Sequence, residues 1–156
     1  MSNEIKIREA VKNDLPVLLQ FEQQVVKAER PFDPTIKNSN VSYYDLEALI
    51  LNPRAIVLVA CEEEKIVASG YAVEKPARPY LDHKTYAYLG FMYTEPAYRG
   101  QGINGKIVTS LQEWASSVGL TEIRLHVYSE NEPAIRAYEK VGFKKHMIEM
   151  RLRTKS

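Results

Sequence analysis

The stretch Arg99-Gly100-Gln101-Gly102-Ile103-Asn104-Gly105 places three glycines within seven residues. It follows a strand-like segment, Tyr86 to Thr94, and opens an amphipathic helical pattern that continues through Lys106, Ile107, Val108, Leu111 and Trp114 to a stop at Gly119. Glycines leave the backbone N–H groups unobstructed at a helix N-terminus, where the helix dipole favours negative charge. We therefore interpret residues 99–105 as a binding site for an anion such as a pyrophosphate.

Two nucleotide-binding motifs are alternatives for this loop. A Walker A motif requires a serine or threonine after the lysine to hold magnesium, and Ile107 stands there after Lys106, which argues against an ATPase. Gly100, Gly102 and Gly105 also spell the G-x-G-x-x-G of a dinucleotide-binding Rossmann unit, with Glu130 as a candidate ribose-binding acid. However, residues 95–99 separate the strand from the first glycine, and the motif comes late in the chain. An NAD-binding protein of the Rossmann type therefore remains a remote alternative.

The loop resembles the [QR]-x-x-G-x-[GA] motif of the GNAT superfamily of N-acyltransferases, with Arg99 to Asn104 in the motif positions. Downstream, Asn131-x-x-Ala134-x-x-x-Tyr138-x-x-x-Gly142-Phe143 looks like the second half-site of that family. The resemblance covers residues 86–143. Asn104 departs from it, because the family usually has glycine or alanine there. A larger side chain narrows the space beside the cofactor or forms a hydrogen bond with it.

The resemblance implies that acetyl-CoA is the co-substrate, and the sequence gives no reason to expect a metal. It implies a cofactor site made of the glycine loop, backbone N–H groups of the preceding strand that stabilise the oxyanion, and the second motif. The residues so identified are Met92, Tyr93, Thr94, Arg99, Gly100, Gln101, Gly102, Ile103, Asn104, Gly105, Asn131 and Tyr138.

Tyr138 and His126 are the candidate catalytic residues. By resemblance Tyr138 is the general acid that protonates the departing CoA thiolate. His126 lies on a predicted strand, Glu122 to Tyr128, whose apolar side chains alternate with polar ones, and it belongs to the polar face. An imidazole with an unperturbed pKa of about 6.5 can serve as general base, directly or through water. The three histidines lack the spacing of metal ligands.

The acceptor site is the least determined part of the sequence. By resemblance it is built from the first two helices and the loop before Tyr86, and Glu29, Phe32 and Tyr80 are the candidate substrate-binding residues. Acids and aromatic rings suit a cationic amine. The predicted function is therefore transfer of an acetyl group from acetyl-CoA to a primary amine, by direct attack through a tetrahedral intermediate. A non-catalytic acyl-CoA-binding or sensor module is the alternative from another class.

The whole chain, residues 1–156, is predicted to be one domain of ordinary globular composition. A net charge of +1 gives no reason to expect nucleic acid or a membrane surface as a partner. The single cysteine, Cys61, ends an apolar strand, so we expect a buried side chain and a cytoplasmic protein. A homodimer is a further expectation that the resemblance allows.

The element order indicates a mixed α+β fold. The resemblance implies the GNAT acyl-CoA N-acyltransferase fold, with a mostly antiparallel central sheet that is flanked by helices and splayed near Thr94. The chain order is β-α-α-β-β-β-α-β-α-β. The expected strands are Ile5–Glu9, Ala55–Cys61, Ile66–Val73, Tyr86–Thr94, Glu122–Tyr128 and Lys144–Leu152. We expect Asn13 or Asp14 to cap the first helix and the second helix to start near Ser42. The third helix is expected to follow the glycine loop, and the last one to cover Pro133–Val141.

Overall fold

A five-stranded sheet forms the centre of the computed structural model, which describes residues 4–155. The strands are β1 Ile5–Glu9, β2 Ala55–Glu62, β3 Lys65–Pro76, β4 Thr85–Thr94 and β5 Ile123–Leu125, and they lie in chain order across the sheet. Neighbours run antiparallel from β1 to β4, whereas β4 and β5 are parallel. The expected mixed, mostly antiparallel sheet is thus confirmed, and the parallel sheet of a Rossmann unit is absent from residues 4–155.

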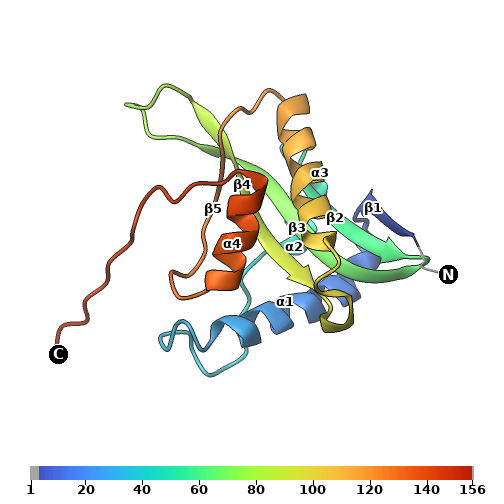
Figure 1. Ribbon diagram of the computed structural model, residues 1–156, viewed down its shortest axis with the longest axis horizontal. Coiled ribbons are helices and arrows are strands. Elements are labelled where there is room, and N and C mark those ends of the chain that lie inside the picture. Colours follow the sequence, from blue (N-terminus) through green and yellow to red (C-terminus); the bar gives the residue numbers. More distant parts are fainter. Residues whose placement is uncertain (1–3, 156) are drawn as a thin grey trace.

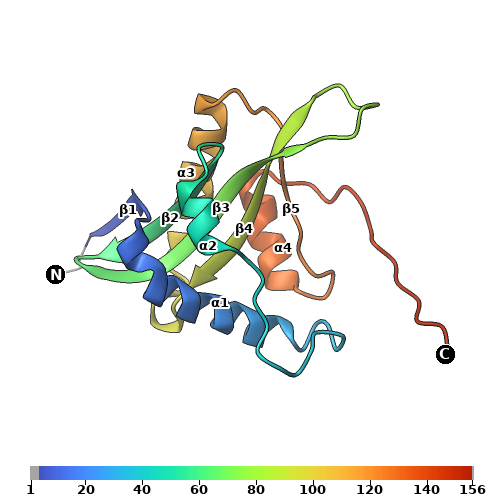
Figure 2. The same ribbon diagram turned by 180° about the vertical axis from the view of Figure 1, so that it is seen from behind.

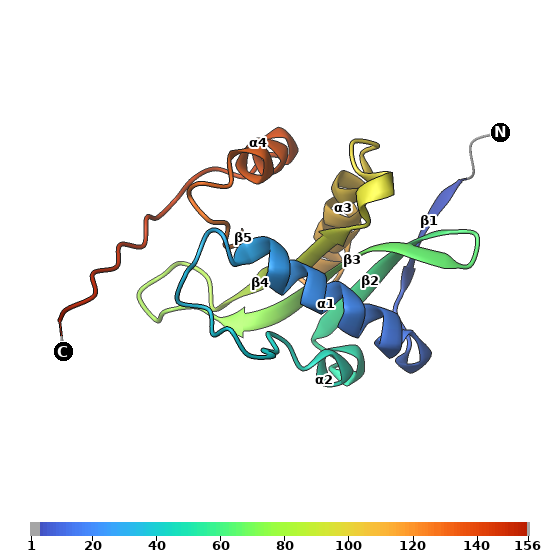
Figure 3. The same ribbon diagram turned by 90° about the horizontal axis from the view of Figure 1, so that it is seen from below.

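Helices cover both faces of the sheet (Figure 1, Figure 2). They are α1 Leu15–Glu29, α2 Leu46–Leu51, α3 Ile103–Ser117 and α4 Glu132–Val141, with short 3₁₀ turns at Lys12–Asp14 and Pro96–Tyr98. One apolar cluster joins the sheet to α1 and α2, and a second joins the opposite face to α3 and α4 (Figure 3). Among the described residues no helix combines the length and apolar character needed to cross a bilayer.

One predicted helix start is confirmed and another is wrong. The side chain of Asn131 accepts a bond from the N–H of Ala134 at 3.4 Å and caps α4, as expected for an asparagine before a helix. The α2 helix is capped by Asp45, so the prediction of a start near Ser42 was wrong. Ser42 is not available as a cap because its hydroxyl lies 3.4 Å from a carboxylate oxygen of Glu22 on α1.

A β-bulge in β4 changes which face of the sheet its side chains reach. Phe91 has a φ of +58°, and the pairing with β3 shifts between Ser69 and Tyr71 opposite it. The hydroxyl of Ser69 donates to the carbonyl of Phe91 at 3.1 Å. Leu89 packs on the α3 side and Phe91, two residues later, on the α1 side, although residues two apart on a regular strand share a face. The bulge therefore reverses the faces to which the side chains at the end of β4 point, just before the glycine loop.

The strand β5 is shorter than the predicted Glu122–Tyr128. Only Ile123 to Leu125 pair with β4, opposite Ala87 to Leu89. Beyond Leu89, residues 90–94 of β4 continue with no strand beside them on that edge. The predicted splay near Thr94 corresponds to this region, and it begins at Gly90.

The last predicted strand, Lys144 to Leu152, was wrong: these residues form no strand. They leave α4 as an extended segment that runs away from the sheet (Figure 1). A polar-apolar alternation gives a segment the tendency to pair, but a strand forms only where another strand offers its free backbone groups. No strand of the described chain lies beside residues 144–152.

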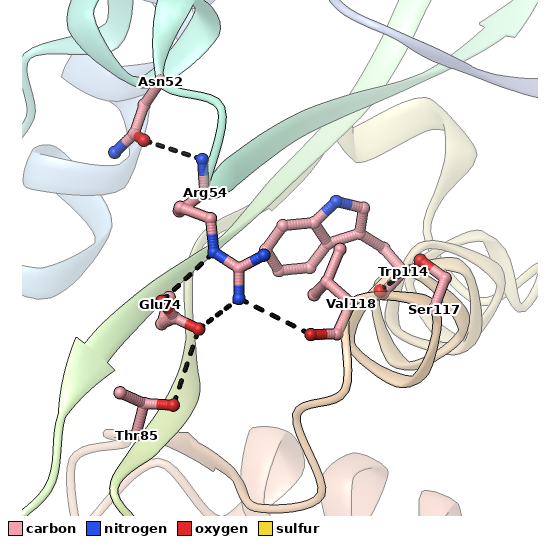
Figure 4. Close-up of polar contacts among 7 residues, drawn as sticks. All are labelled: Asn52, Arg54, Glu74, Thr85, Trp114, Ser117 and Val118. Atoms are coloured by element: carbon pink, nitrogen blue, oxygen red, sulfur yellow. Dashed lines mark hydrogen bonds and ion pairs between the residues drawn. The ribbon is translucent and has the colours of Figure 1, made fainter.

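Arg54 fixes the crossover from α3 to β5 (Figure 4). Its guanidinium pairs with both carboxylate oxygens of Glu74, near the end of β3, and donates to the carbonyl of Val118, just after α3, at 3.5 Å. Thr85 at the start of β4 contacts the same carboxylate. These contacts lower the pKa of Glu74, mainly through the hydrogen bond from Arg54. They join β3, β4 and the end of α3 at the end of the sheet away from the glycine loop.

Candidate functional site

The glycine loop presents uncapped N–H groups at the start of α3. Gly100 and Gly102 both have a φ of +79°, a conformation that favours glycine, and Gly102 occupies the N-cap position. No side chain caps this end of the helix. A Cβ atom added at Gly100, Gly102 or Gly105 would meet nothing within 4 Å, so the loop faces open space. A helix N-terminus with these features is suited to bind a phosphate group.

The other loop residues contribute in different ways. The side chain of Ile103 is only 2% exposed, so Ile103 can offer a ligand its backbone alone. Asn104 is half-buried on the first turn of α3. The guanidinium of Arg99 turns back to the carbonyl of Thr94 at 2.9 Å, and the amide of Gln101 reaches the carbonyl of Ala97 at 3.5 Å. Arg99 and Gln101 therefore brace the loop in this structure.

An open groove of about 670 Å³ adjoins the loop. Its lining includes Gly102 and Gly105 together with two cations, Lys106 on α3 and Lys140 on α4. The phosphates of acetyl-CoA are anionic, so glycine N–H groups and two lysines in one groove fit that co-substrate. Neither lysine was identified from the sequence, where both looked like ordinary surface charges.

The end of β4 lies beside the loop and contains the three residues predicted to supply backbone N–H groups. Met92 packs next to Gly70, where an added Cβ would lie 2.8 Å from the Met92 sulfur. Tyr93 is buried with its ring 4.7 Å from that of Phe21, and Thr94 holds Arg99. The side chains of Met92 and Tyr93 thus pack in the core, whereas Thr94 accepts the bond from Arg99 with its backbone carbonyl.

Tyr138 lies on α4 with its ring 5.9 Å from that of Phe143 in a T-shaped contact. Gly142, with a φ of +119°, ends the helix and allows the chain to turn so that Phe143 reaches Tyr138. Burial raises the pKa of Tyr138 to about 12, and the negative charge of Glu29 contributes. The hydroxyl therefore keeps its proton at neutral pH and is available as a proton donor.

Glu29 ends α1 on the opposite face of the sheet from α4. Burial raises its pKa, and the negative charge of Asp33 adds to the increase. The charge of Glu29 in turn contributes to the raised pKa of five phenols, those of Tyr43, Tyr44, Tyr88, Tyr128 and Tyr138. Four of these lie on the α1 side or follow β5, and Tyr138 comes from the other side. The charge of Glu29 thus acts on phenols from both sides of the sheet.

The aromatic side chains around Glu29 are ordered by their own contacts. Phe32 stacks on Tyr128 with ring centres 5.6 Å apart and planes at 13°. Tyr43 lies edge-on to Tyr44 at 5.7 Å, and the Tyr43 hydroxyl is buried with no hydrogen-bond partner within bonding distance among residues 4–155. Glu29 and Phe32, predicted as substrate residues, therefore occupy one region. Tyr80 does not join them: it lies on the β3–β4 loop with 78% of its surface exposed.

Glu22 positions two of these tyrosines and was not identified from the sequence. Its side chain is 1% exposed, and one carboxylate oxygen accepts bonds from the backbone N–H groups of Tyr43 and Tyr44, each at 2.8 Å. The signal for it was present: Glu22 interrupts the apolar stripe of α1 between Leu18 and Val25. An acid at such a position needs buried donors.

His126 is exposed and lies just beyond β5. Its Nδ1 atom is 3.2 Å from the hydroxyl of Tyr88, and the two rings meet at 67°. Ile123 and Leu125 pack on the α3 side, so the alternation predicted for this segment is confirmed and His126 belongs to the other face. Tyr88 connects His126 to the surroundings of Glu29. Within residues 4–155, histidine, cysteine and acidic side chains do not gather in groups of three that could hold a metal ion.

Comparison with known proteins gives a family match over most of the chain. The model of the acetyltransferase (GNAT) family matches residues 22–143. A curated relative, the thialysine N-epsilon-acetyltransferase of Sus scrofa, is 40% identical over 55 residues. That stretch is 35% of this chain and 32% of the relative, so the match spans about a third of the relative's length.

Solved structures match the whole fold. A variant of the BH1408 protein from Bacillus halodurans superposes with a TM-score of 0.81 at 25% identity, covering 96% of this chain and 99% of that one. A predicted acetyltransferase from Clostridium acetobutylicum, solved with acetyl-CoA, gives a TM-score of 0.76 at 21% identity, and the match covers 96% of both chains. At that identity the likeness shows the fold.

Proposed function

The chain belongs to the acetyltransferase (GNAT) family, and on this basis we propose that it transfers the acetyl group of acetyl-CoA to a primary amine. The observation that carries the proposal is the uncapped N-terminus of α3 at Gly100, Gly102 and Gly105, beside a groove that Lys106 and Lys140 line. Tyr138 on α4 keeps its proton at neutral pH and is the proposed proton donor. A domain that only bound acyl-CoA would not need such a donor.

We propose that the glycine loop binds the pyrophosphate of acetyl-CoA. Gly100, Gly102 and Gly105 offer N–H groups and space, and Lys106 and Lys140 neutralise phosphate charge in the adjoining groove. The pantetheine arm runs along the free edge of β4 past Met92, Tyr93 and Thr94, with Asn131 at its other side. Acetyl-CoA supplies the activated thioester carbonyl.

In the proposed reaction the nitrogen of a neutral amine attacks that carbonyl directly and forms a tetrahedral intermediate. Backbone N–H groups of β4 stabilise its oxyanion. When the C–S bond breaks, the Tyr138 hydroxyl donates its proton to the thiolate, and His126 takes the proton of the amine directly or through water. The transfer from Tyr138 is uphill, because its pKa of about 12 exceeds the about 8.5 of a thiol. A cation bound beside Glu29 offsets the charge that contributes to this raised pKa.

The proposed acceptor is a primary amine on a molecule that carries positive charge. Glu29 provides the negative charge, and Phe32 with its stacked partner Tyr128 provides an aromatic wall that favours cations. Tyr80 is a proposed contact for an extended substrate, because it lies on the loop between β3 and β4. The name of the pig relative gives a lysine analogue as its acceptor, which is an amine of this class. The lone cysteine, Cys61, is buried and free, which suits the proposed cytoplasmic setting.

The first experiment is thermal shift with acetyl-CoA, CoA and NADH, followed by release of the CoA thiol from acetyl-CoA in the presence of thialysine, lysine and an uncharged hydroxy analogue. A ligand that binds only the folded chain raises its melting temperature. We expect a rise with acetyl-CoA and none with NADH, and turnover with the two amines but not with the analogue. Tight binding of acetyl-CoA without turnover on a broad panel of amines would instead identify a non-catalytic acyl-CoA-binding module.

A further inference from the structure

Two cationic side chains lie beside two tyrosines on β3, β4 and β5. Lys75 on β3 pairs with Tyr86 on β4, and Tyr88 on β4 pairs with Arg124 on β5. Residues that pair directly across two strands point to the same face of the sheet, as do residues two apart on one strand. Tyr88 packs against the apolar cluster on the α1 side. All four side chains therefore belong to that side, which is the side of the proposed amine site.

Both cations lie over the tyrosine rings. The Nζ atom of Lys75 is 4.1 Å from the ring centre of Tyr88, and the guanidinium carbon of Arg124 is 4.0 Å from the ring centre of Tyr86. These contacts are well within the range of cation–π attraction, which extends to about 6 Å. Because the two rings are neighbours on one strand, the positive charges approach each other from the strands on either side. Two cations held in this way favour an anion between them.

Arg124 is positioned mainly by a histidine. One terminal nitrogen of its guanidinium lies 2.8 Å from Nε2 of His83, and a guanidinium can only donate, so Nε2 accepts. The Nδ1 atom of the same ring donates to Asp82 at 2.8 Å, which makes His83 neutral in this arrangement. Glu122 contacts only Nε of Arg124, at 3.4 Å. Among residues 4–155 these bonds leave the second terminal nitrogen of Arg124 without a partner, and Lys75 forms no ion pair.

Tyr88 connects this pair of cations to the proposed reaction site. Its ring carries Lys75, and its hydroxyl lies 3.2 Å from Nδ1 of His126, the proposed base. Burial raises the pKa of Tyr88, and the negative charges of Tyr86 and Glu29 contribute to the increase. The α1 side of the sheet therefore has a negative group, Glu29, and a pair of positive groups that both act on Tyr88 or its neighbour on β4.

We propose that Lys75 and Arg124 bind the carboxylate of the acceptor, and that the acceptor is an amino acid with a primary amine on its side chain. This inference rests on the proposed function, because it adds an anion subsite to the same amine site. The free terminal nitrogen of Arg124 and the Nζ atom of Lys75 supply charged donors for the two carboxylate oxygens. Glu122, and Asp82 behind His83, disfavour a second negative charge, so a carboxylate fits better than a phosphate dianion.

The test compares lysine with cadaverine, which has the same carbon chain and both amines but lacks the carboxylate. We expect the wild type to have a kcat/KM for lysine about tenfold or more above that for cadaverine, because only lysine pairs with the two cations. Lys75→Met/Arg124→Gln should remove most of this preference, by raising the KM for lysine far more than the KM for cadaverine. Lys75→Met alone replaces an exposed side chain and should remove part of the preference, which keeps the test valid if Arg124→Gln disturbs β5.

Two matched controls carry the same substitutions at other places. Lys65→Met replaces a lysine on the same strand, whose Nζ atom lies 5.4 Å from the ring centre of Tyr98. Arg136→Gln replaces an exposed arginine on α4, on the opposite side of the sheet. Both controls should keep the wild-type preference for lysine.

Calorimetric titration of the full chain with lysine and with cadaverine, in the presence of CoA, measures the subsite without turnover. Tighter binding of lysine that Lys75→Met/Arg124→Gln loses would support the subsite even if neither compound is acetylated, and that outcome would reject the proposed function alone. Acetylation of both compounds with equal kcat/KM would overturn the subsite and leave the proposed function intact. Equal affinities, no binding of lysine, or a preference for lysine that survives in the double variant would also overturn the subsite.

Discussion

The carboxylate of Glu22 accepts a hydrogen bond from the backbone N–H of Tyr43 at 2.8 Å, although the two residues are 21 positions apart in the chain. The neighbouring N–H of Tyr44 reaches the same oxygen at the same distance. One buried acid on α1 thus holds a loop of irregular backbone against the helix. Since Tyr43 and Tyr44 are two of the phenols around Glu29, Glu22 positions the proposed amine site without belonging to it.

We expect Glu22→Gln to lower the free energy of unfolding by about 1–3 kcal/mol, because bonds to a buried charged acceptor become bonds to a neutral one. Urea unfolding measures this change. Glu47→Gln is the matched control on the exposed surface of α2 and should have an effect within about 0.5 kcal/mol. Equal effects of the two substitutions would show that the buried carboxylate does not hold the loop.

Replacing Tyr138 with phenylalanine should reduce kcat about 10²-fold or more and leave the Kd of acetyl-CoA nearly unchanged, because only the proton donor is lost. Steady-state kinetics and calorimetric titration give the two quantities. Tyr98→Phe is the control, since the Tyr98 hydroxyl bonds to Glu62 at 2.8 Å and has no proposed role in the reaction. An unchanged kcat in Tyr138→Phe would remove Tyr138 as the acid.

Glu29→Gln should raise the KM of a cationic amine about tenfold or more and leave the KM of acetyl-CoA unchanged. The same variant should be at least as stable as the wild type at neutral pH. Burial raises the pKa of Glu29, so the folded chain binds more protons than the unfolded one between the two pKa values, and stability falls as pH rises through that window. Thermal unfolding across mildly acidic pH should show this dependence only in the wild type. A KM that does not change would place the amine elsewhere.

Two glycine substitutions separate backbone strain from space for the ligand. Gly102 has a φ of +79°, so Gly102→Ala should cost about 1–2 kcal/mol of stability as well as acetyl-CoA affinity. Gly105 lies within α3 at ordinary helical angles, so Gly105→Ala should leave stability unchanged or slightly raised. A loss of acetyl-CoA affinity in Gly105→Ala would then show that the added methyl group takes up space that the phosphates need beside the helix. If affinity stays at the wild-type value, the phosphates do not approach Gly105.

Acid should destabilise the protein partly through Asp14. The hydrogen bond from Arg8, followed by that from the N–H of Val11, lowers the pKa of Asp14. A carboxyl whose pKa is depressed on folding stabilises the native state above its unfolded pKa, and this contribution is lost as pH falls through the folded value. Asp14→Asn should therefore cost about 1–3 kcal/mol at neutral pH and show a smaller loss of stability below about pH 4. Asp82→Asn, whose side chain is 98% exposed, is the control.

The order of elements up to α4 and the two motifs could be predicted from the sequence because each depends on a local pattern. The glycine loop, the alternation of Ile123 and Leu125 and the cap by Asn131 depend on a few neighbouring residues. The start of α2 was missed because Ser42 is engaged by Glu22, a contact between distant parts of the chain. The bulge at Phe91 was also missed, since nothing in the sequence of a strand indicates that it contains one residue more than its partner strand.

Of the candidate site, the sequence indicated the residues near the loop and only part of the acceptor side. Glu29 and Phe32 were selected as polar and aromatic residues of the first helix and the loop after it, and the structure brings them together with Tyr128. Lys106 and Lys140 were missed because their common groove depends on how α3 and α4 lie beside each other. The strand predicted over residues 144–152 was wrong, because strand pairing depends on the surroundings of a segment as well as on its alternation of polar and apolar residues.

The bulge at Phe91 makes the length of β4 more important than its composition. Without the additional residue, Met92 and Tyr93 would exchange faces, the ring that rests on Phe21 would be forced under α3, and the glycine loop would start from a strand turned by half a rotation. We expect conservative replacements along β4 to leave this arrangement intact, except at Gly90, where an added Cβ would lie 2.6 Å from the ring of Tyr71, whereas deletion of one residue should reverse it. The geometry of the site therefore depends more on the number of residues in β4 than on the identity of their side chains.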